Sequence, residues 1–133
     1  MKKHLLTLAL VCCFAAGQAG AMTQDEYKVA KEKAEANYKV DKAKCDTLIG
    51  NAKDICMKQA DGKEKIAKAE LEQQYKPSNG HAREVEETKV EAAHSIAMEK
   101  CEDHKGDAKN ACEKQADADK ARGKAQIDSM KKM

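Results

Sequence analysis

Apolar residues from position 22 onward recur at steps of three and four along a chain that is otherwise strongly charged. Such steps place side chains on one side of an α-helix, and they predict a first helix from about Gln24 to Ile49. Similar shallow stripes predict helices over about 52–74, from His81 onward and from Ala108 onward, the last weakening at residues 122–123. The first stripe runs through Tyr27, Ala30, Ala34, Tyr38, Cys45 and Leu48. The pattern predicts an all-α fold.

Turn residues stand where the predicted helices end. Gly50 suits the left-handed residue that ends the first helix, and Asn51 suits the N-cap of the second. Gly106 and Asp107 repeat this chemistry between the third and fourth helices. The sequence therefore predicts two helix–turn–helix hairpins.

Capping and linker residues set the bounds of these hairpins. Thr23 and Glu26 form a capping box at the start of the first helix. Pro77 cannot continue a helix, because it lacks a backbone N–H. We expect hairpins over residues 22–76 and 81–133, joined by the linker 77–80.

The two hairpins are copies of one unit. Shifting the chain by 56 positions aligns residues 44–61 with 100–117, and ten of the 18 positions are identical. Upstream residues also match their counterparts, namely Val29, Lys33, Glu35 and Ala36. The duplication therefore covers both arms of the hairpin as well as its turn.

Four cysteines lie in the two hairpins, and an even count usually means disulfides if a chain is exported. Of the three possible pairings, geometry favours Cys45 with Cys56 and Cys101 with Cys112. The members of each pair stand five and six residues from the turn glycine, at matching heights on antiparallel helices. The Cα atoms of a disulfide lie within about 6.8 Å of each other, so small residues should line the seam. We expect these to be Ala52, Ala60, Ala108 and Ala116.

The N-terminus has the pattern of a secretory signal peptide. A basic start at Lys2 and Lys3 precedes an apolar run from Leu5 to Ala16, and cleavage is expected after Ala21. The run is shorter than the roughly 20 apolar residues that span a bilayer. We expect residues 1–21 to be removed and the protein to be periplasmic, without a membrane span.

Two cysteines within this segment raise the alternative of a lipoprotein. Acylation of Cys12 or Cys13 would anchor the chain, but that processing prefers Gly, Ala or Ser before the cysteine. Val11 and Cys12 stand there instead. We expect both cysteines to leave with the signal.

Composition and charge exclude several classes of function. The chain has 25 basic and 23 acidic residues, and the signal segment holds two lysines and no acid, which leaves a balanced mature chain. A nucleic-acid binder needs a one-sided basic patch, so we expect no nucleic-acid partner. The chain has no Trp and one Phe, which lies in the signal segment, so its core must be thin.

No motif of a catalytic or cofactor site is present. The cysteine spacing is unlike the Cys-x-x-Cys of redox enzymes. Cys101 and His104 have a spacing that suits metal ligands, but the first hairpin has Leu48 at the position of His104. We expect His81, His94 and His104 to be exposed helix residues, and we expect no catalytic residue, cofactor or metal site.

The segment Lys44–Cys56 reads Lys-Cys-Asp-Thr-Leu-Ile-Gly-Asn-Ala-Lys-Asp-Ile-Cys, and Ala69–Pro77 reads Ala-Glu-Leu-Glu-Gln-Gln-Tyr-Lys-Pro. With these segments the chain resembles a group of small exported proteins of Gram-negative bacteria, some of which carry a cell-envelope or TolA-like label. The resemblance covers nearly the whole mature chain and supplies no active-site residues.

The sequence thus predicts two tandem disulfide-stapled antiparallel hairpins, which form either a four-helix bundle or an elongated pair. We expect a non-catalytic envelope protein that acts through helix-face contacts with a protein partner or a second copy. One alternative is a stress-related periplasmic binder that shields unfolded proteins. Another is a metal-binding module that uses His94, His104 and the thiols.

Overall fold

A computed structural model describes residues 20–131; residues 1–19 of the predicted signal segment, Cys12 and Cys13 among them, lie outside this range. The described residues form four helices and no strand, which confirms the all-α prediction. The helices are α1 (Gln24–Cys45), α2 (Gly50–Tyr75), α3 (Asn79–Cys101) and α4 (Gly106–Met130).

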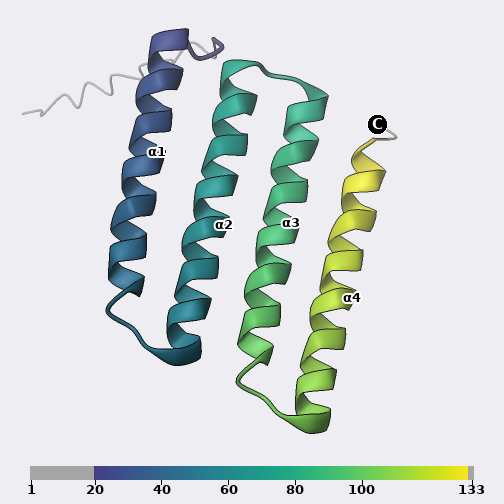
Figure 1. The fold of residues 1–133 in the computed structure, drawn as a ribbon. Coiled ribbons are helices and arrows are strands. Elements are labelled where there is room, and N and C mark those ends of the chain that lie inside the picture. Colours follow the sequence, from purple (N-terminus) through teal and green to yellow (C-terminus); the bar gives the residue numbers. More distant parts are fainter. Residues whose placement is uncertain (1–19, 132–133) are drawn as a thin grey trace, which may run out of the picture.

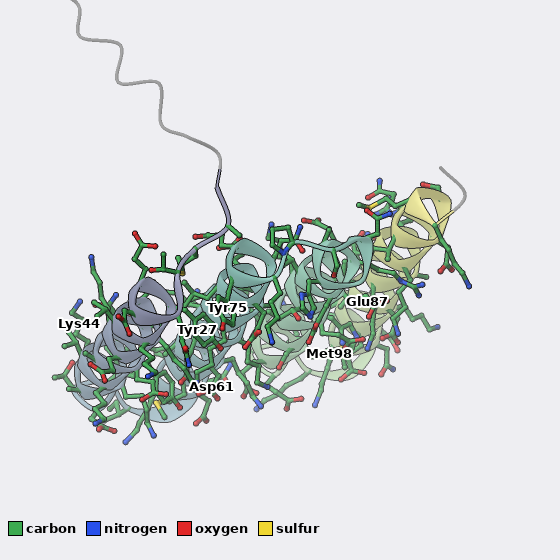
Figure 2. The ribbon with its side chains drawn as sticks, turned by 90° about the horizontal axis from the view of Figure 1, so that it is seen from above. Tyr27, Lys44, Asp61, Tyr75, Glu87 and Met98 are labelled. Carbon is green, nitrogen blue, oxygen red and sulfur yellow. A yellow bond between two sulfur atoms is a disulfide. The ribbon has the colours of Figure 1, made fainter. Side chains whose placement is uncertain are left out.

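The four helices stand side by side in one row, in the order of the sequence (Figure 1). Within residues 20–131, α1 contacts α2, α2 contacts α3 and α3 contacts α4, and no other pair of helices touches. Seen from above, the row remains a single layer from α1 to α4 (Figure 2). The tandem hairpins are therefore confirmed, and they pack together through α2 and α3. The row stays open, however, because α1 and α4 do not meet to close a bundle.

The turns differ in detail from the sequence prediction. Helix α1 ends at Cys45, four residues before the predicted end, and α2 begins at Gly50. Gly50 has a φ of 60°, a left-handed value that glycine adopts without strain, but it opens α2 rather than closing α1. Ile49, not Asn51, occupies the N-cap, since the chain is extended there with φ −128° and ψ 158°.

The second turn repeats this geometry. Gly106 has a φ of 58° and opens α4, while Lys105 takes the N-cap with φ −132° and ψ 155°. Asp107 is not the cap itself. It lies in the first turn of α4, where the helix dipole stabilises a negative charge. The two turns are therefore structural copies, as the 56-residue repeat predicts.

The other helix starts are capped by side chains. The capping box is confirmed: the Thr23 N–H donates to Glu26 Oε2 at 2.8 Å, and the Glu26 N–H donates to Thr23 Oγ1 at 3.3 Å. Helix α3 starts two residues earlier than predicted, because Ser78 caps it by accepting from the His81 N–H at 3.0 Å. The predicted linker thus contributes its last two residues to the helix.

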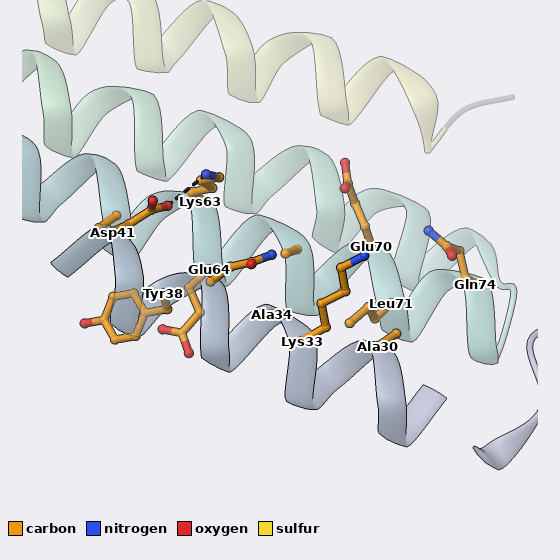
Figure 3. Close-up of a pocket in the computed structure, with 13 residues that line it drawn as sticks. Ala30, Lys33, Ala34, Tyr38, Asp41, Lys63, Glu64, Glu70, Leu71 and Gln74 are labelled. Carbon is orange, nitrogen blue, oxygen red and sulfur yellow. Dashed lines mark hydrogen bonds and ion pairs between the residues drawn. The ribbon is translucent and has the colours of Figure 1, made fainter. Parts of the chain in front are cut away.

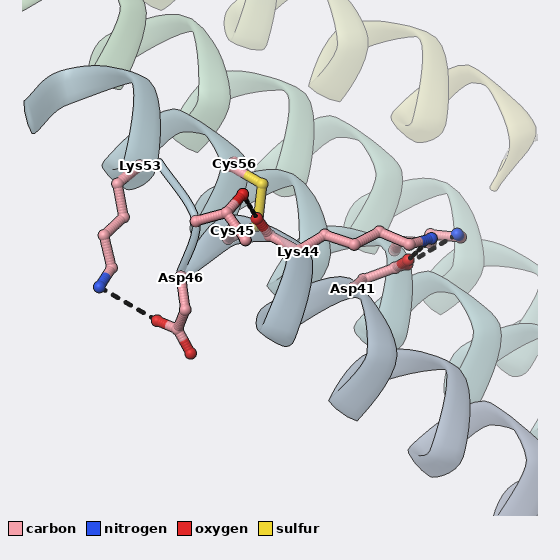
Figure 4. Close-up of a disulfide and its surroundings, with 8 residues drawn as sticks. Asp41, Lys44, Cys45, Asp46, Lys53 and Cys56 are labelled. Atoms are coloured by element: carbon pink, nitrogen blue, oxygen red, sulfur yellow. Dashed lines mark hydrogen bonds and ion pairs between the residues drawn. A yellow bond between two sulfur atoms is a disulfide. The ribbon is translucent and has the colours of Figure 1, made fainter. Parts of the chain in front are cut away.

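Both predicted disulfides are present. Cys45 and Cys56 have Cα atoms 5.4 Å apart, and Cys101 and Cys112 have Cα atoms 5.6 Å apart. Figure 4 shows the first disulfide at the closed end of its hairpin, beside an ion pair of 3.0 Å between Lys53 and Asp46 across the turn. Each staple joins the last residue of one helix to the second turn of the next.

Small residues line the disulfide seam on one side only. Ala60 and Ala116, one turn beyond each staple, are both buried. Ala52 and Ala108 are exposed, contrary to the prediction, because they lie in the first turns of α2 and α4, beyond the last residue of the preceding helix, so that no helix faces them. The two helices of each hairpin therefore pack closely on the side of the disulfide that lies away from the turn.

The interior of the row is thin. Its buried apolar residues are Cys45, Ala60, Ala69, Val85, Cys101, Ala116 and Ile127. Leu48 was predicted to continue the first stripe, but it is exposed because it lies in the turn beyond the end of α1. Much of the helix surface faces solvent, as expected for a layer one helix thick.

Two glycines let neighbouring helices come close. A Cβ on Gly62 of α2 would lie 3.0 Å from Ala92 Cβ of α3, and a Cβ on Gly123 of α4 would lie 2.6 Å from Val90 Cγ2 of α3. Helix α4 therefore continues past Gly123, where it was predicted to weaken. The glycine is a contact surface for Val90, and this packing offsets its low helix propensity.

Removing the first disulfide should destabilise the protein markedly. For Cys45→Ala/Cys56→Ala we expect a loss of about 3 kcal/mol in the free energy of unfolding, because the unfolded chain regains the freedom of a loop of about a dozen residues. Urea denaturation measures this loss. Cys101→Ala/Cys112→Ala is the matched variant and should cost about the same; a loss below about 1 kcal/mol in both would contradict the stapling role.

The contact between Gly123 and Val90 predicts a strong coupling. An alanine in a helix interior is more favourable than glycine by about 1 kcal/mol, but here the added methyl collides with Val90. Gly123→Ala should therefore leave the free energy of unfolding of the wild-type chain no higher. In a Val90→Ala background, the same substitution should raise it by about 1 kcal/mol. A double-mutant cycle by urea denaturation measures the coupling.

Gly80→Ala provides the control for this cycle. A Cβ on Gly80 would meet its nearest neighbour, Ser78 Oγ, at an ordinary 3.7 Å. Its effect on stability should be the same in the wild-type chain and in the Val90→Ala background. Equal effects of Gly123→Ala in both backgrounds would show that residues 90 and 123 do not touch.

Candidate interaction surface

Polar side-chain pairs cross both hairpins at the same positions of the repeat. In the first hairpin, Tyr38 Oη donates to Asp61 Oδ1 at 2.6 Å, and in the second, His94 Nε2 lies 2.8 Å from Asp117 Oδ1. The other matched pairs are Tyr27–Glu72 with Arg83–Asp128, Glu35–Lys68 with Glu91–Lys124, and Asp46–Lys53 with Glu102–Lys109. The two hairpins thus share one register down to individual side chains, although the residue types differ.

A shallow groove of about 230 Å³ lies between α1 and α2 of the first hairpin (Figure 3). Its apolar lining consists of Ala30, Ala34, Ala60, Ala67 and Leu71. Charged residues of both signs surround this lining: Lys33, Asp41, Lys63, Glu64 and Glu70. A groove with a narrow apolar floor and a charged rim suits a protein segment that presents small apolar side chains.

The groove lies where the two hairpins have diverged: of its 13 lining residues, only Lys33 and Ala60 have identical counterparts 56 positions later. Ala34 and Ala67 line it, and the repeat places Val90 and Gly123 at the equivalent positions of the second hairpin. There, the Val90 methyl groups fill the space above Gly123. In the first hairpin, the smaller pair of alanines leaves this space open.

Charge at one end of the groove is set by Asp41. Its carboxylate accepts from Lys63 Nζ at 2.8 Å (Figure 3) and from Lys44 Nζ at 3.5 Å beside the disulfide (Figure 4). The hydrogen bond and charge of Lys63, with a smaller contribution from Lys44, lower the pKa of Asp41. Asp41 is therefore ionised at neutral pH.

Tyr38 lies beside Asp41 on α1 and stays neutral over a wide pH range. Its hydrogen bond to Asp61 is the main cause that raises its pKa from 10.0 to about 12, with smaller contributions from burial and from the charges of Asp61 and Glu64. The phenol therefore acts as a fixed hydrogen-bond donor that ties α1 to α2 at the groove.

The open end of the first hairpin is held by aromatic contacts. The rings of Tyr27 and Tyr75 stack with centroids 4.6 Å apart, and Figure 2 shows the two side chains together between α1 and α2. Tyr27 Oη also donates to Glu72, and this hydrogen bond raises the pKa of Tyr27. The Met22 N–H donates to the Gln74 carbonyl oxygen at 3.0 Å. The disulfide at one end and these contacts at the other fix the two walls of the groove.

The three histidines of the hairpins lie differently from the sequence prediction. Of the three, only His104 is exposed, and it lies in the second turn rather than on a helix. His81 is half-buried with Nδ1 2.7 Å from the Lys76 carbonyl oxygen, and His94 is half-buried against Asp117. His81 and His94 are partly covered by residues from other segments of the chain, which the sequence of one helix does not show.

Asn51 has a function in the structure that sequence reasoning missed. Its Nδ2 donates to the Glu99 carbonyl oxygen at 3.0 Å and to Asp103 Oδ1 at 2.8 Å. The residue predicted as a cap therefore links the first hairpin to the second. No sequence signal distinguished the two roles, since the same side chain can cap a helix with Oδ1 as acceptor or donate with Nδ2.

The described residues contain neither a candidate metal site nor a helix that could span a membrane. Between residues 20 and 131, no group of three or more His, Cys, Asp or Glu side chains could hold a metal ion. All four cysteines of the hairpins are engaged in disulfides. In the same range, none of the helices combines the length and the apolar character needed to cross a membrane.

No protein-family model, curated protein or solved structure matches the chain. The resemblance of Lys44–Cys56 and Ala69–Pro77 to small exported proteins therefore stays a prediction.

The Tyr38–Asp61 pair predicts a titration that identifies it. Tyr38 should ionise at about pH 12, and Asp61→Asn should return its pKa toward the ordinary value of 10.0, because the anionic acceptor is gone. Since the pKa is higher in the folded protein than in the unfolded chain, this pair stabilises the protein below pH 10 and its contribution is lost as the pH rises through 12. Ultraviolet titration of tyrosinate in single-tyrosine variants measures the shift. Asp117→Asn, the matched change in the second hairpin, should leave the Tyr38 titration unchanged.

Proposed function

We propose that this chain is an exported, non-catalytic helical protein that binds a protein partner in the groove between α1 and α2. The observation that carries the proposal is the divergence of the two hairpins at this groove. The second hairpin packs Val90 over Gly123, whereas the first keeps an open surface at Ala34 and Ala67. An apolar surface that the second hairpin covers is thus left open in the first, where a partner can contact it.

Export and location in the periplasm are part of the proposal. The two disulfides support it, because such bonds persist in oxidising compartments. The basic start and the apolar run Leu5–Ala16 support it as well. The groove supports binding rather than catalysis, since its polar residues form ion pairs at the rim and its floor is apolar.

The groove is shaped for one kind of partner segment. Its apolar floor is made of alanines and one leucine, so it accepts small or narrow side chains. Lys33 and Lys63 alternate around it with Asp41, Glu64 and Glu70, which favours a segment with charges of both signs. An amphipathic helix meets both requirements, because one of its faces is apolar and its flanks are charged.

Filling the groove should weaken binding without affecting the fold. The double substitution Ala34→Val/Ala67→Gly gives the first hairpin the packing of the second. A photo-crosslinking residue at position 33, on the rim, should form an adduct of one discrete mass in cells that export the protein. We expect this adduct to fall at least about tenfold in the filled variant, since the lost contact area removes more than about 1.4 kcal/mol of binding energy.

Position 87 on the second hairpin is the control for this experiment. It corresponds to position 31 in the repeat and lines a separate hollow between α3 and α4, away from the groove, together with Arg83, Glu91 and Lys124. It should form no adduct of the same mass. An adduct at position 33 that persists in the filled variant would contradict the proposal, as would a broad ladder of masses typical of a general binder of unfolded proteins.

A further inference from the structure

The row ends in two helices whose outer surfaces are copies of surfaces that are buried in its centre. The repeat relates α1 to α3 and α2 to α4. Helix α3 lies between two neighbours, whereas α1 has one neighbour and an open outer edge. The outer edge of α1 therefore corresponds to the face of α3 that packs on α2.

Apolar residues occupy this edge of α1. The α3 face toward α2 includes Val85, Ala92 and Ile96, and the last two lie within 4 Å of a Cβ placed on Gly62. Their counterparts 56 positions earlier are Val29, Ala36 and Val40. Val85 is 7% exposed, whereas Val29 is 65% exposed and Val40 is 54% exposed. The edge carries the residues of an interface and has no partner for them within the described chain.

The outer edge of α4 supplies the opposite half of that interface. On α2, Gly62 faces α3, and Ala69 lies two helical turns further along the same side. Their counterparts on α4 are Ala118 and Ala125, which are exposed. Small residues on this edge would allow a neighbouring helix to approach closely, as Gly62 allows α3 to do.

We propose that the α4 edge of one copy packs against the α1 edge of a second copy, in the antiparallel register of the α2–α3 contact. In that register Gly62 faces Ala92, so Ala118 of one copy would face Ala36 of the next. A Cβ at position 62 would lie 3.0 Å from Ala92 Cβ, so an alanine there needs slightly wider spacing. The contact between copies should therefore be weaker than the contact between hairpins.

Charge at this edge favours the same register. Residue 66 pairs with residue 88 in the antiparallel α2–α3 alignment that sets Gly62 against Ala92, and these two residues are Ile66 and Thr88. Their counterparts are Arg122 on α4 and Glu32 on α1, which are both exposed and carry opposite charges. The repeat has thus replaced an uncharged pair by two oppositely charged residues at the place where two copies would meet, and Arg122, which pairs with Asp119 of its own helix, remains exposed.

Such a contact joins two different surfaces of one chain, so it does not close by itself in a dimer. Each added copy would leave one free α1 edge and one free α4 edge, and the assembly would extend as a ribbon or close as a ring. Closure within one chain is not available, because α1 and α4 lie at opposite ends of the row (Figure 1). The contact uses the edges and leaves the groove between α1 and α2 free, so it does not depend on the proposed partner.

Two complementary variants test this arrangement in the oxidised chain from residue 22 onward. Val29→Glu/Val40→Glu blocks the α1 edge, and Ala118→Glu/Ala125→Glu blocks the α4 edge. In sedimentation velocity, the wild-type mass should rise with concentration beyond that of a dimer. Each blocked variant alone should remain a monomer. An equimolar mixture should form a heterodimer and stop there, because it holds one intact edge of each kind.

Ala52→Glu/Ala93→Glu is the matched control, since both alanines are exposed on central helices and the charge change is the same. It should assemble like the wild type, as should Ala34→Val/Ala67→Gly, which tests the groove. A wild-type chain that stays monomeric at the highest concentration would overturn the proposal. So would a variant blocked at α4 that still dimerises alone, because that result would show a symmetric α1–α1 contact instead.

Discussion

The disulfide beside each turn is the constraint on which the rest of the structure depends. The chain buries mostly alanine and cysteine side chains, so packing alone gives little stability and little definition of register. Cys45–Cys56 and Cys101–Cys112 fix one point where two helices approach within a Cα distance of 5.4 or 5.6 Å. This point sets the register in which polar side chains pair along each hairpin. The last pair is Tyr27 with Glu72 in the first copy and Arg83 with Asp128 in the second.

The helices pack through short distances between their axes rather than through large side chains. Gly62 brings α2 against α3, and Gly123 brings α4 against α3. Each contact adds dispersion energy by shortening the distance between helices rather than by adding large side chains. The small size of the packed side chains also affects the arrangement of the helices. Helices that carry few large apolar residues gain little from wrapping around a common centre, so a row with each helix against its neighbour suffices.

Duplication followed by divergence explains which surfaces are available for function. The polar pairs keep their positions in both hairpins while their chemistry changes, as Tyr38 and Asp61 become His94 and Asp117. The groove at Ala34 is open in one copy and filled by Val90 in the other. A repeated unit must also end somewhere, and a terminal repeat without a polar outer face leaves an interface unpaired. Val29 and Val40 mark such an end.

The sequence by itself determined the four helices, the two hairpins and the pairing of their cysteines. These features follow from local periodicity, turn glycines and a repeat, which are all legible within short stretches. It also suggested the stripe that lines the groove. Only the tertiary structure decided that the hairpins form an open row, that Gly50 opens α2, and that Asn51 reaches α3. The reason is physical. Helix α3 carries two shallow apolar stripes, and a stripe of small residues shows that a face is packed but not which helix packs on it.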